Sequence, residues 1–258
     1  MQTAERLAVP TGSSPGSMLL AQGGRRCLLF AVLPVLTVAA VGWSVVAQSD
    51  TRGMVGAGAF FVAWLVMMVA MMLPAVAPVA GLYVVAARRR FVAAAPVFLA
   101  GYLAVWAASA LPAYVVSRAV STPLMDGRPW AARLVGVTLL AAAGYQLTPL
   151  KQSCLRACRS PMSFFLTRRT SLSRPSAAFA AGVEHGIYCL GCCWALMAVL
   201  VVLGGMQLGW ALALALVISA EKLLPHGPTV ARAIAGLCVV SGAALLAAPS
   251  LLFHLIRM

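Results

Sequence analysis

Long apolar runs separated by short basic segments dominate this chain of 258 residues. Several of the runs exceed the roughly 20 residues that an α-helix needs to cross a bilayer. Hydrophobic residues make up 62% of the chain and charged residues 9%, whereas a soluble domain carries about a quarter charged residues. The chain therefore cannot be an ordinary water-soluble globule. Because short segments of alternating hydrophobicity are absent, we exclude a β-barrel and predict an all-α, polytopic transmembrane helix bundle.

The apolar pattern predicts about seven membrane spans. Their expected ranges are 27–48, 55–87, 91–117, 130–150, 176–203, 206–224 and 228–249. The second range is too long for one straight span, and it contains Pro74 and Pro78. Each proline removes a backbone donor, so we predict that this helix is broken near its middle. Broken helices at membrane depth are tolerated where they are buried in protein or line a cavity.

Basic residues between the spans predict the orientation of the chain. With the N-terminus in the cytoplasm, inner segments hold 14 of the 19 Lys and Arg residues and outer segments hold 5, which follows the positive-inside rule. We therefore assign the net charge of +14 to topology and anionic lipid headgroups rather than to nucleic acid. Residues 1–26 are expected to form a flexible cytoplasmic tail. Residues 27–258 are expected to form a single transmembrane domain, with a basic cytoplasmic loop at 151–175.

The stretch from Gly182 to Met197 is apolar but carries five side chains of the types that bind soft or borderline metals. They are Glu184, His185, Cys189, Cys192 and Cys193. Ionisable groups at membrane depth are costly and usually functional. On a helix, the histidine and the three cysteines fall within about 100° of arc, but His185 and Cys192 are separated by about 10 Å of rise. One ion cannot span that distance, so the stretch predicts a metal site with a neighbouring relay position. The alternative is that the cysteines are small apolar fillers, which we prefer for Cys27 and Cys238.

A methionine cluster precedes the first of the two prolines. It consists of Met67, Met68, Met71 and Met72. Thioethers select Cu(I) and other soft ions, and the predicted topology places this cluster near mid-membrane, where it could face the cysteines. The alternative is that methionine serves as a flexible core filler.

Two further cysteines, Cys154 and Cys158, follow the fourth predicted span. Their spacing places them on one face of a helix, at the cytoplasmic mouth of the bundle. Basic residues flank the pair and should favour the thiolate, which is the form that binds metal. A spacing of four is not the usual zinc-ribbon spacing, and a pair of reduced cytosolic thiols is the alternative interpretation.

The sixth predicted span ends at Glu221 and Lys222. One interpretation is an interfacial ion pair whose lysine extends to the membrane surface. The functional hypothesis is a gate, or a residue pair that supports the Glu184–His185 region without binding the metal directly.

Together these segments resemble a bacterial family of predicted metal-binding integral membrane proteins, a family without an established activity. The segments that carry the resemblance are Met-Met-x-x-Met-Met-Leu-Pro74, Tyr145-Gln146 with Pro149, Lys151, Cys154 and Cys158, the run from Gly182 to Met197, and Glu221-Lys222. The resemblance covers nearly the whole chain from the first span onward. It implies a multi-pass protein of the bacterial cytoplasmic (inner) membrane with Cys and Met ligands, and it names neither a reaction nor a metal.

From these patterns we predict a protein that handles a soft transition metal such as Cu(I), by transport or delivery. Another soft or borderline transition metal remains open. The expected partners are the lipid bilayer, the metal ion and a metallochaperone or metalloenzyme, with no nucleic acid. Two alternatives stay open: a membrane thiol–disulfide carrier, and a structural or assembly subunit of a membrane metalloenzyme. We expect no enzymatic activity, because no set of nucleophile, base and orienting group can be assembled from the polar residues.

Overall fold

The computed structural model describes residues 37–44, 56–86, 94–159, 174–203, 208–224, 226–250 and 252. This part of the chain contains helices and no strands, so the all-α prediction is confirmed. The helices are α2 (Ala57–Ala86), α3 (Ala94–Met125), α4 (Pro129–Gln146), α5 (Pro149–Arg159), α7 (Pro175–Val202), α8 (Leu208–Leu223) and α9 (Gly227–Ala247), and residues 37–44 are also helical. Proline occupies the first or second position of α4, α7 and α9, where its missing N–H has no intrahelical partner to lose.

Four of the described helices contain segments that are long and apolar enough to cross a membrane. These segments are Ala57–Pro74, Pro96–Met125, Pro175–Val202 and Gly227–Ala247. The expected ranges 130–150 and 206–224 contain most of α4 and all of α8, but α4 contains Arg133 and Gln146, and α8 has 16 residues. Of the expected span 27–48, the structure describes residues 37–44. The predicted tail at 1–26 lies outside the described residues.

The predicted break in the second helix is wrong. Helix α2 continues without interruption from Ala57 to Ala86, through both Pro74 and Pro78. A proline deletes one i→i−4 hydrogen bond, and packing against neighbouring helices can hold the helix together across that gap. The residues before Pro74 are packed in this way, since Met71, Met72 and Leu73 are all buried.

The basic segment expected as a loop at 151–175 begins as a helix. Helix α5 extends from Pro149 to Arg159, and α7 begins at Pro175. Residues 160–173 lie outside the described part of the chain. The fold therefore places Cys154 and Cys158 on an ordered element rather than on a loop.

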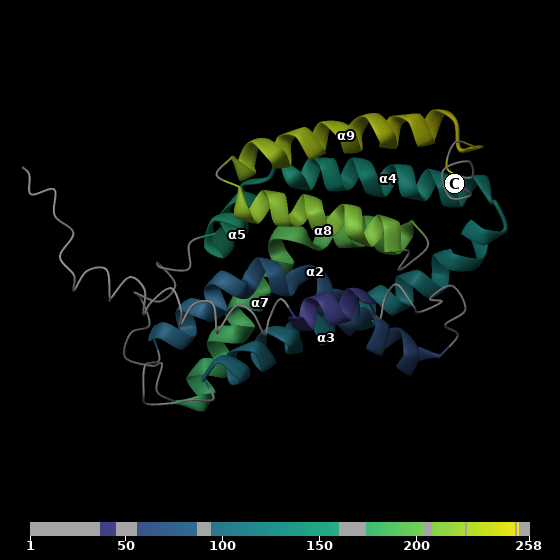
Figure 1. Cartoon of the computed structure of the whole chain (residues 1–258). Coiled ribbons are helices and arrows are strands. Elements are labelled where there is room, and N and C mark those ends of the chain that lie inside the picture. The colour runs from purple at the N-terminus through teal and green to yellow at the C-terminus, as the bar shows by residue number, and fades with distance from the viewer. Residues whose placement is uncertain are drawn as a thin grey trace, which may run out of the picture.

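Helix α7 connects the two groups of helices. Figure 1 shows α4, α8 and α9 in one layer and α2 and α3 in the other, and α7 contacts α3, α4, α5 and α8. Among the described helices, α3 and α7 share the most extensive contact. Apolar packing alone brings little net attraction inside a lipid environment, so close backbone approach between small residues is a favoured way to join helices there. A Cβ added at Gly182 would lie 2.0 Å from the Phe98 carbonyl oxygen, and one added at Gly101 would lie 2.2 Å from that of Phe179.

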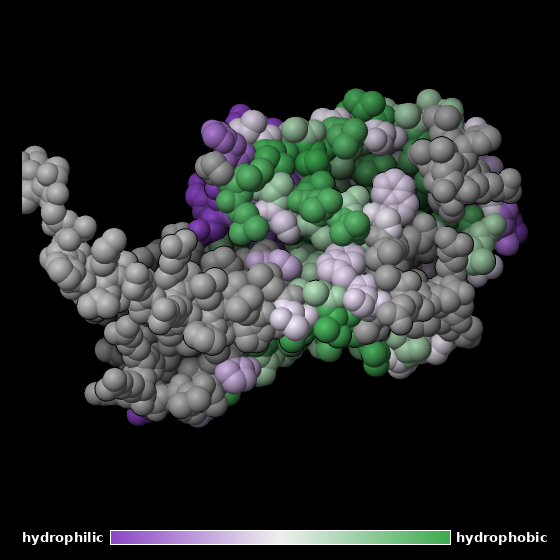
Figure 2. Space-filling model, in the orientation of Figure 1, coloured by the Kyte–Doolittle hydropathy of each residue, from purple (hydrophilic) through white to green (hydrophobic). Residues whose placement is uncertain are grey.

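The outer surface of the bundle is apolar over the layer formed by α8 and α9. Figure 2 shows hydrophobic residues across this face and hydrophilic residues gathered at the end where α5 lies. The exposed apolar side chains include Leu212, Leu216, Leu237, Val239 and Val240. An apolar exterior of this kind is what a lipid-facing surface requires.

Candidate metal centre

Three thiols on α7 form the centre of the site. Cys189, Cys192 and Cys193 are all buried, with 3%, 1% and 1% of their surfaces exposed. The Cys192 and Cys193 thiols donate to the Cys189 carbonyl oxygen, over 3.1 Å and 3.0 Å. These bonds direct both sulfurs back toward the Cys189 turn, because residues three and four positions apart share one helix face.

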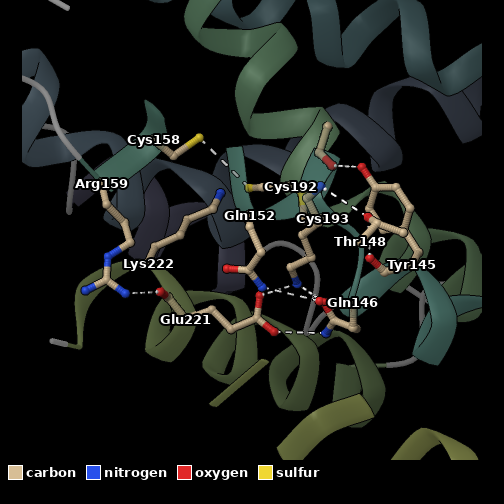
Figure 3. Close-up of polar contacts among 12 residues, drawn as sticks. Tyr145, Gln146, Thr148, Gln152, Cys158, Arg159, Cys192, Cys193, Glu221 and Lys222 are labelled. Carbon is tan, nitrogen blue, oxygen red and sulfur yellow. Dashed lines mark hydrogen bonds and ion pairs between the residues drawn. The ribbon is translucent and has the colours of Figure 1, made fainter. Parts of the chain in front are cut away.

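Helix α5 brings a fourth thiol to the site. The Cys158 sulfur lies 3.9 Å from the Cys192 sulfur, and Figure 3 shows the two facing each other between α5 and α7. Cys154 packs one turn earlier, where a Cβ at Gly191 would lie 2.8 Å from its sulfur. The absence of a side chain at Gly191 therefore lets α5 approach α7. The sequence placed Cys154 and Cys158 at a cytoplasmic mouth and did not predict this contact between Cys158 and Cys192.

Side chains from two other helices contact Cys189, and one of them also contacts a methionine of α2. Lys222 of α8 places its Nζ 3.0 Å from the Cys189 sulfur and 3.8 Å from the Met72 sulfur of α2. The Tyr102 hydroxyl of α3 lies 3.1 Å from the same cysteine sulfur. Charge-assisted hydrogen bonds of this kind are among the strongest in proteins. The Cys189 sulfur is therefore held by a cation and a hydroxyl in an apolar interior.

The four methionines of α2 share one core with the thiols. Met67, Met68, Met71 and Met72 are each exposed by 1% or less, and all belong to the buried cluster that contains Cys189, Cys192 and Cys193. Met72 reaches the thiols through Lys222. The two clusters thus share one core in the fold, and Lys222 contacts both Met72 and Cys189.

His185 and Glu184 lie one turn before the first thiol on α7. The His185 ring is buried between Phe98 and Tyr102 of α3, with ring centroids 6.0 Å from each. Glu184 is half-buried. The relay position predicted from helical spacing is therefore embedded in the α3–α7 interface.

A buried polar network lies beside the thiols and joins α4, α5 and α8. Lys151 pairs with Glu221, with Nζ 2.6 Å from Oε2, and it also donates to the Gln146 side-chain oxygen. The Gln146 amide donates to the other carboxylate oxygen of Glu221 over 2.9 Å. All three side chains are exposed by 2% or less. Figure 3 shows this network next to the Cys158–Cys192 pair.

Glu221 and Lys222 do not form the interfacial ion pair that was one interpretation of the sequence. The carboxylate pairs with Lys151 and the ammonium points at Cys189, and both side chains are buried. Adjacent residues on a helix point about 100° apart, so each faces a different neighbour. The functional hypothesis, a gate or a support for the Glu184–His185 region, stays a prediction, and the contact that Lys222 makes is with Cys189.

The pKa values of the two α5 cysteines contradict the expectation that flanking basic residues favour the thiolate form. Burial raises the pKa of Cys154. Hydrogen bonds with the Cys189 and Cys192 sulfurs, together with burial, raise the pKa of Cys158 well above its ordinary value. The expectation is wrong because the basic side chains bind elsewhere. Lys151 pairs with Glu221, and Arg159 donates to the Glu221 backbone oxygen over 3.1 Å.

No group of three or more His, Cys, Asp and Glu side chains forms a closed metal site among the described residues. The arrangement instead offers a two-sulfur contact between helices, two more thiols within one turn, and a thioether nearby. Soft sulfur ligands of this kind select Cu(I) over hard ions such as Mg²⁺.

Three residues of the site were not singled out as candidates from the sequence. They are Tyr102, Gln146 and Lys151. Gln146 is a polar side chain at the end of an apolar run, and such a residue at membrane depth is a signal of function. Lys151 was noted as a flanking charge and as part of the family resemblance but not as a site residue, because nothing in a single sequence shows that a lysine is buried.

The fold and the site define an apolar helical protein with a buried centre of thiol and thioether groups. A family model described as "PpoB2: Copper chaperone" matches residues 61–245, which include every helix from α3 to α8 and most of α2 and α9. The protein belongs to this copper chaperone family. The copper-related part of the prediction is confirmed at that level. Neither the curated proteins nor the solved structures contain a match to this chain.

Proposed function

We propose that the protein is a membrane-embedded, non-catalytic chaperone that binds Cu(I) between α5 and α7 and delivers it to a metalloprotein. The observation that carries the proposal is the contact between Cys158 and Cys192, since it joins two thiols from different helices at 3.9 Å. With metal–sulfur bonds of about 2.3 Å, two sulfurs on one ion lie about 3.8 Å apart in tetrahedral geometry and about 4.0 Å apart in trigonal geometry. The observed separation suits either arrangement.

The charge of the site supports a monovalent ion. Two thiolates and one Cu(I) carry a net charge of −1, and Lys222, with its Nζ 3.0 Å from the Cys189 sulfur, would neutralise it. An uncompensated charge in an apolar interior is strongly destabilising. A divalent ion with the same two thiolates would instead leave the site with a net positive charge.

We further propose a path for the ion along the site. Cys154 and Cys158 exchange Cu(I) with the cytoplasmic side, Cys158 and Cys192 bind it between the helices, and Cys189 and Cys193, one turn from Cys192, pass it inward. The cluster Met67, Met68, Met71 and Met72 receives it, with Glu184 and His185 as the relay one turn away. Support comes from the shared core of the methionines and thiols, and from the position of Met72 beside Lys222.

The setting that we propose is the bacterial cytoplasmic (inner) membrane. The chain would cross it about seven times, with the N-terminus in the cytoplasm. Support comes from the four described helices that could span a bilayer, the apolar outer surface of α8 and α9, and the distribution of basic residues.

Metal analysis of the purified, Cu(I)-loaded protein tests this function. We expect Cys158→Ser and Cys192→Ser each to lower the bound copper and to weaken competition with a Cu(I) chelator. The matched control is Cys238→Ser, because Cys238 is also buried but lies on α9 in a separate core cluster. Copper binding that is unchanged in the double variant of Cys158 and Cys192 would remove the assignment.

The same sulfur contact favours thiol–disulfide exchange as a second candidate function. Cys158 and Cys192 could form a reversible disulfide, since they face each other across the α5–α7 interface. Trapping a mixed disulfide with a partner protein would support this function. A protein that binds Cu(I) but shows no redox-active thiol pair would exclude it.

A further inference from the structure

Helix α5 is attached to the bundle by few buried groups. It spans Pro149–Arg159, and of its eleven side chains only Lys151 and Leu155 are buried. Leu155 belongs to the main apolar core. The other buried anchor is a lysine, which can lie in an apolar interior only where its charge is paired and hydrogen-bonded. Besides Leu155 and the packing of α5 against α7, the position of α5 therefore depends on the partners of Lys151.

Both ends of α5 are tied to a single residue of α8. Near the first end, Lys151 Nζ pairs with the Glu221 carboxylate at 2.6 Å, and Gln146 occupies the second carboxylate oxygen. At the other end, Arg159 Nη1 donates to the Glu221 backbone oxygen over 3.1 Å. These two anchors are eight residues apart, or about 12 Å of helix.

The thiols of α5 lie between these two anchors. Cys158 immediately precedes Arg159, and its sulfur lies 3.9 Å from that of Cys192. The residue after Glu221 is Lys222, which contacts Cys189 from the same helix α8. One short segment of α8 therefore holds both α5 and the thiol centre.

We propose that Lys151 and Glu221 are positioning residues, whose buried ion pair fastens α5 to α8 and thereby holds Cys158 against Cys192. The inference rests on the proposed function, in which these two cysteines bind Cu(I). A buried ion pair adds little stability compared with apolar packing, but removing one partner leaves the other charge uncompensated. Its effect here is to set the position of α5. When the pair is broken, α5 separates from α7 and the Cys158 thiol becomes accessible.

The test measures the alkylation rate of Cys158 in the full-length, metal-free protein in lipid nanodiscs, by peptide mass spectrometry after timed exposure to a maleimide. We expect Lys151→Met to raise this rate by more than about tenfold, because the loss of a buried charge partner shifts a local opening equilibrium by at least that factor. The matched control is Arg156→Met on the same helix. Arg156 is exposed, and it donates a hydrogen bond to the Ser153 hydroxyl within α5, so its loss should leave the rate within about twofold. Alkylation of Cys238 on α9 reports the integrity of the rest of the bundle.

A charge exchange keeps the proposal testable if the single variant fails to fold. The double variant Lys151→Glu with Glu221→Lys restores an ion pair of reversed direction, and it should bring the Cys158 rate back to within about threefold of the wild type. If Lys151→Met leaves the Cys158 rate unchanged while Cys238 stays protected, the positioning role is refuted. A charge exchange that folds but leaves Cys158 fully accessible refutes it as well.

Copper binding is measured separately on the same variants, so that the two proposals can fail independently. A raised Cys158 rate with weakened Cu(I) binding supports both the positioning role and the copper site. A raised rate with unchanged Cu(I) binding upholds the positioning of α5 and overturns Cys158 as a ligand.

Discussion

Replacement of Lys222 by methionine gives the sharpest test of the charge balance in the proposed copper site. Lys222 is buried, and its Nζ lies 3.0 Å from the Cys189 sulfur. Methionine keeps the length and the apolar stem of the side chain but removes the charge. We expect Lys222→Met to weaken Cu(I) binding and to reduce discrimination against Zn²⁺.

The magnitude follows from the contact distance. At an effective dielectric constant of about 20, opposite unit charges about 3 Å apart attract each other by about 5.5 kcal/mol. Part of this loss is offset, because the variant no longer buries an ammonium group. A net loss of about 2–3 kcal/mol corresponds to a Kd for Cu(I) that is raised about 30- to 140-fold. The Lys222→Met variant should bind Zn²⁺ as well as the wild type or better, since two thiolates already neutralise a divalent ion without the lysine.

The assay is competition with a chromogenic Cu(I) chelator under anaerobic conditions, repeated with a zinc indicator. Lys222→Arg retains the positive charge and should stay within about tenfold of the wild type. The matched control is Arg232→Met on α9, an exposed cation that binds the Pro228 carbonyl and the Thr229 hydroxyl of its own helix. If Lys222→Met binds Cu(I) as tightly as the wild type, the charge-balance reasoning is refuted.

Three further predictions concern packing, protonation and metal removal. Gly182→Val should lower the free energy of unfolding by about 2–3 kcal/mol through overpacking, because its Cβ would lie 2.0 Å from the Phe98 carbonyl oxygen. The control Gly236→Ala should not be destabilising, because a Cβ at Gly236 meets open space. Equal melting temperatures for the two variants would contradict the close approach of α3 and α7. Burial raises the pKa of Cys154, so its alkylation rate should keep increasing as the pH is raised beyond about 8.5, the ordinary cysteine pKa. A midpoint of the pH–rate profile below that value would be inconsistent with the described environment. Cu(I) loading should protect Cys158 and Cys192 from alkylation, and removal of the metal by a chelator should restore it; protection confined to Cys154 would contradict the proposed site.

Much of the fold follows from the apolar pattern, because a helix in lipid must satisfy its backbone within itself. The expected ranges 176–203 and 228–249 agree closely with α7 and α9. The range 91–117 was too short, since α3 continues to Met125 through Pro112 and Pro123. Proline is the cause of the error in α2. Its local cost can be read from a sequence, whereas the packing that offsets this cost cannot.

Part of the candidate site also followed from helical geometry. Spacing alone placed Cys189, Cys192 and Cys193 on one face of a helix, and the structure buries all three. Cys154 and Cys158 were likewise placed on one face, four residues apart. The contact between Cys158 and Cys192 joins residues 34 positions apart, so no local pattern could reveal it.

The sequence by itself determined the helical class, the apolar exterior and the residue types available to a metal, because these depend on composition and local periodicity. Only the tertiary structure decided which charges are paired. Lys151 and Glu221 are 70 positions apart, and Lys222 and Cys189 are 33 apart. A charge in an apolar interior needs a partner, and the identity of that partner depends on which helices pack together. The packing of α5, α7 and α8 therefore decided that Lys151, which the sequence presents as a flanking charge, is buried and paired with Glu221.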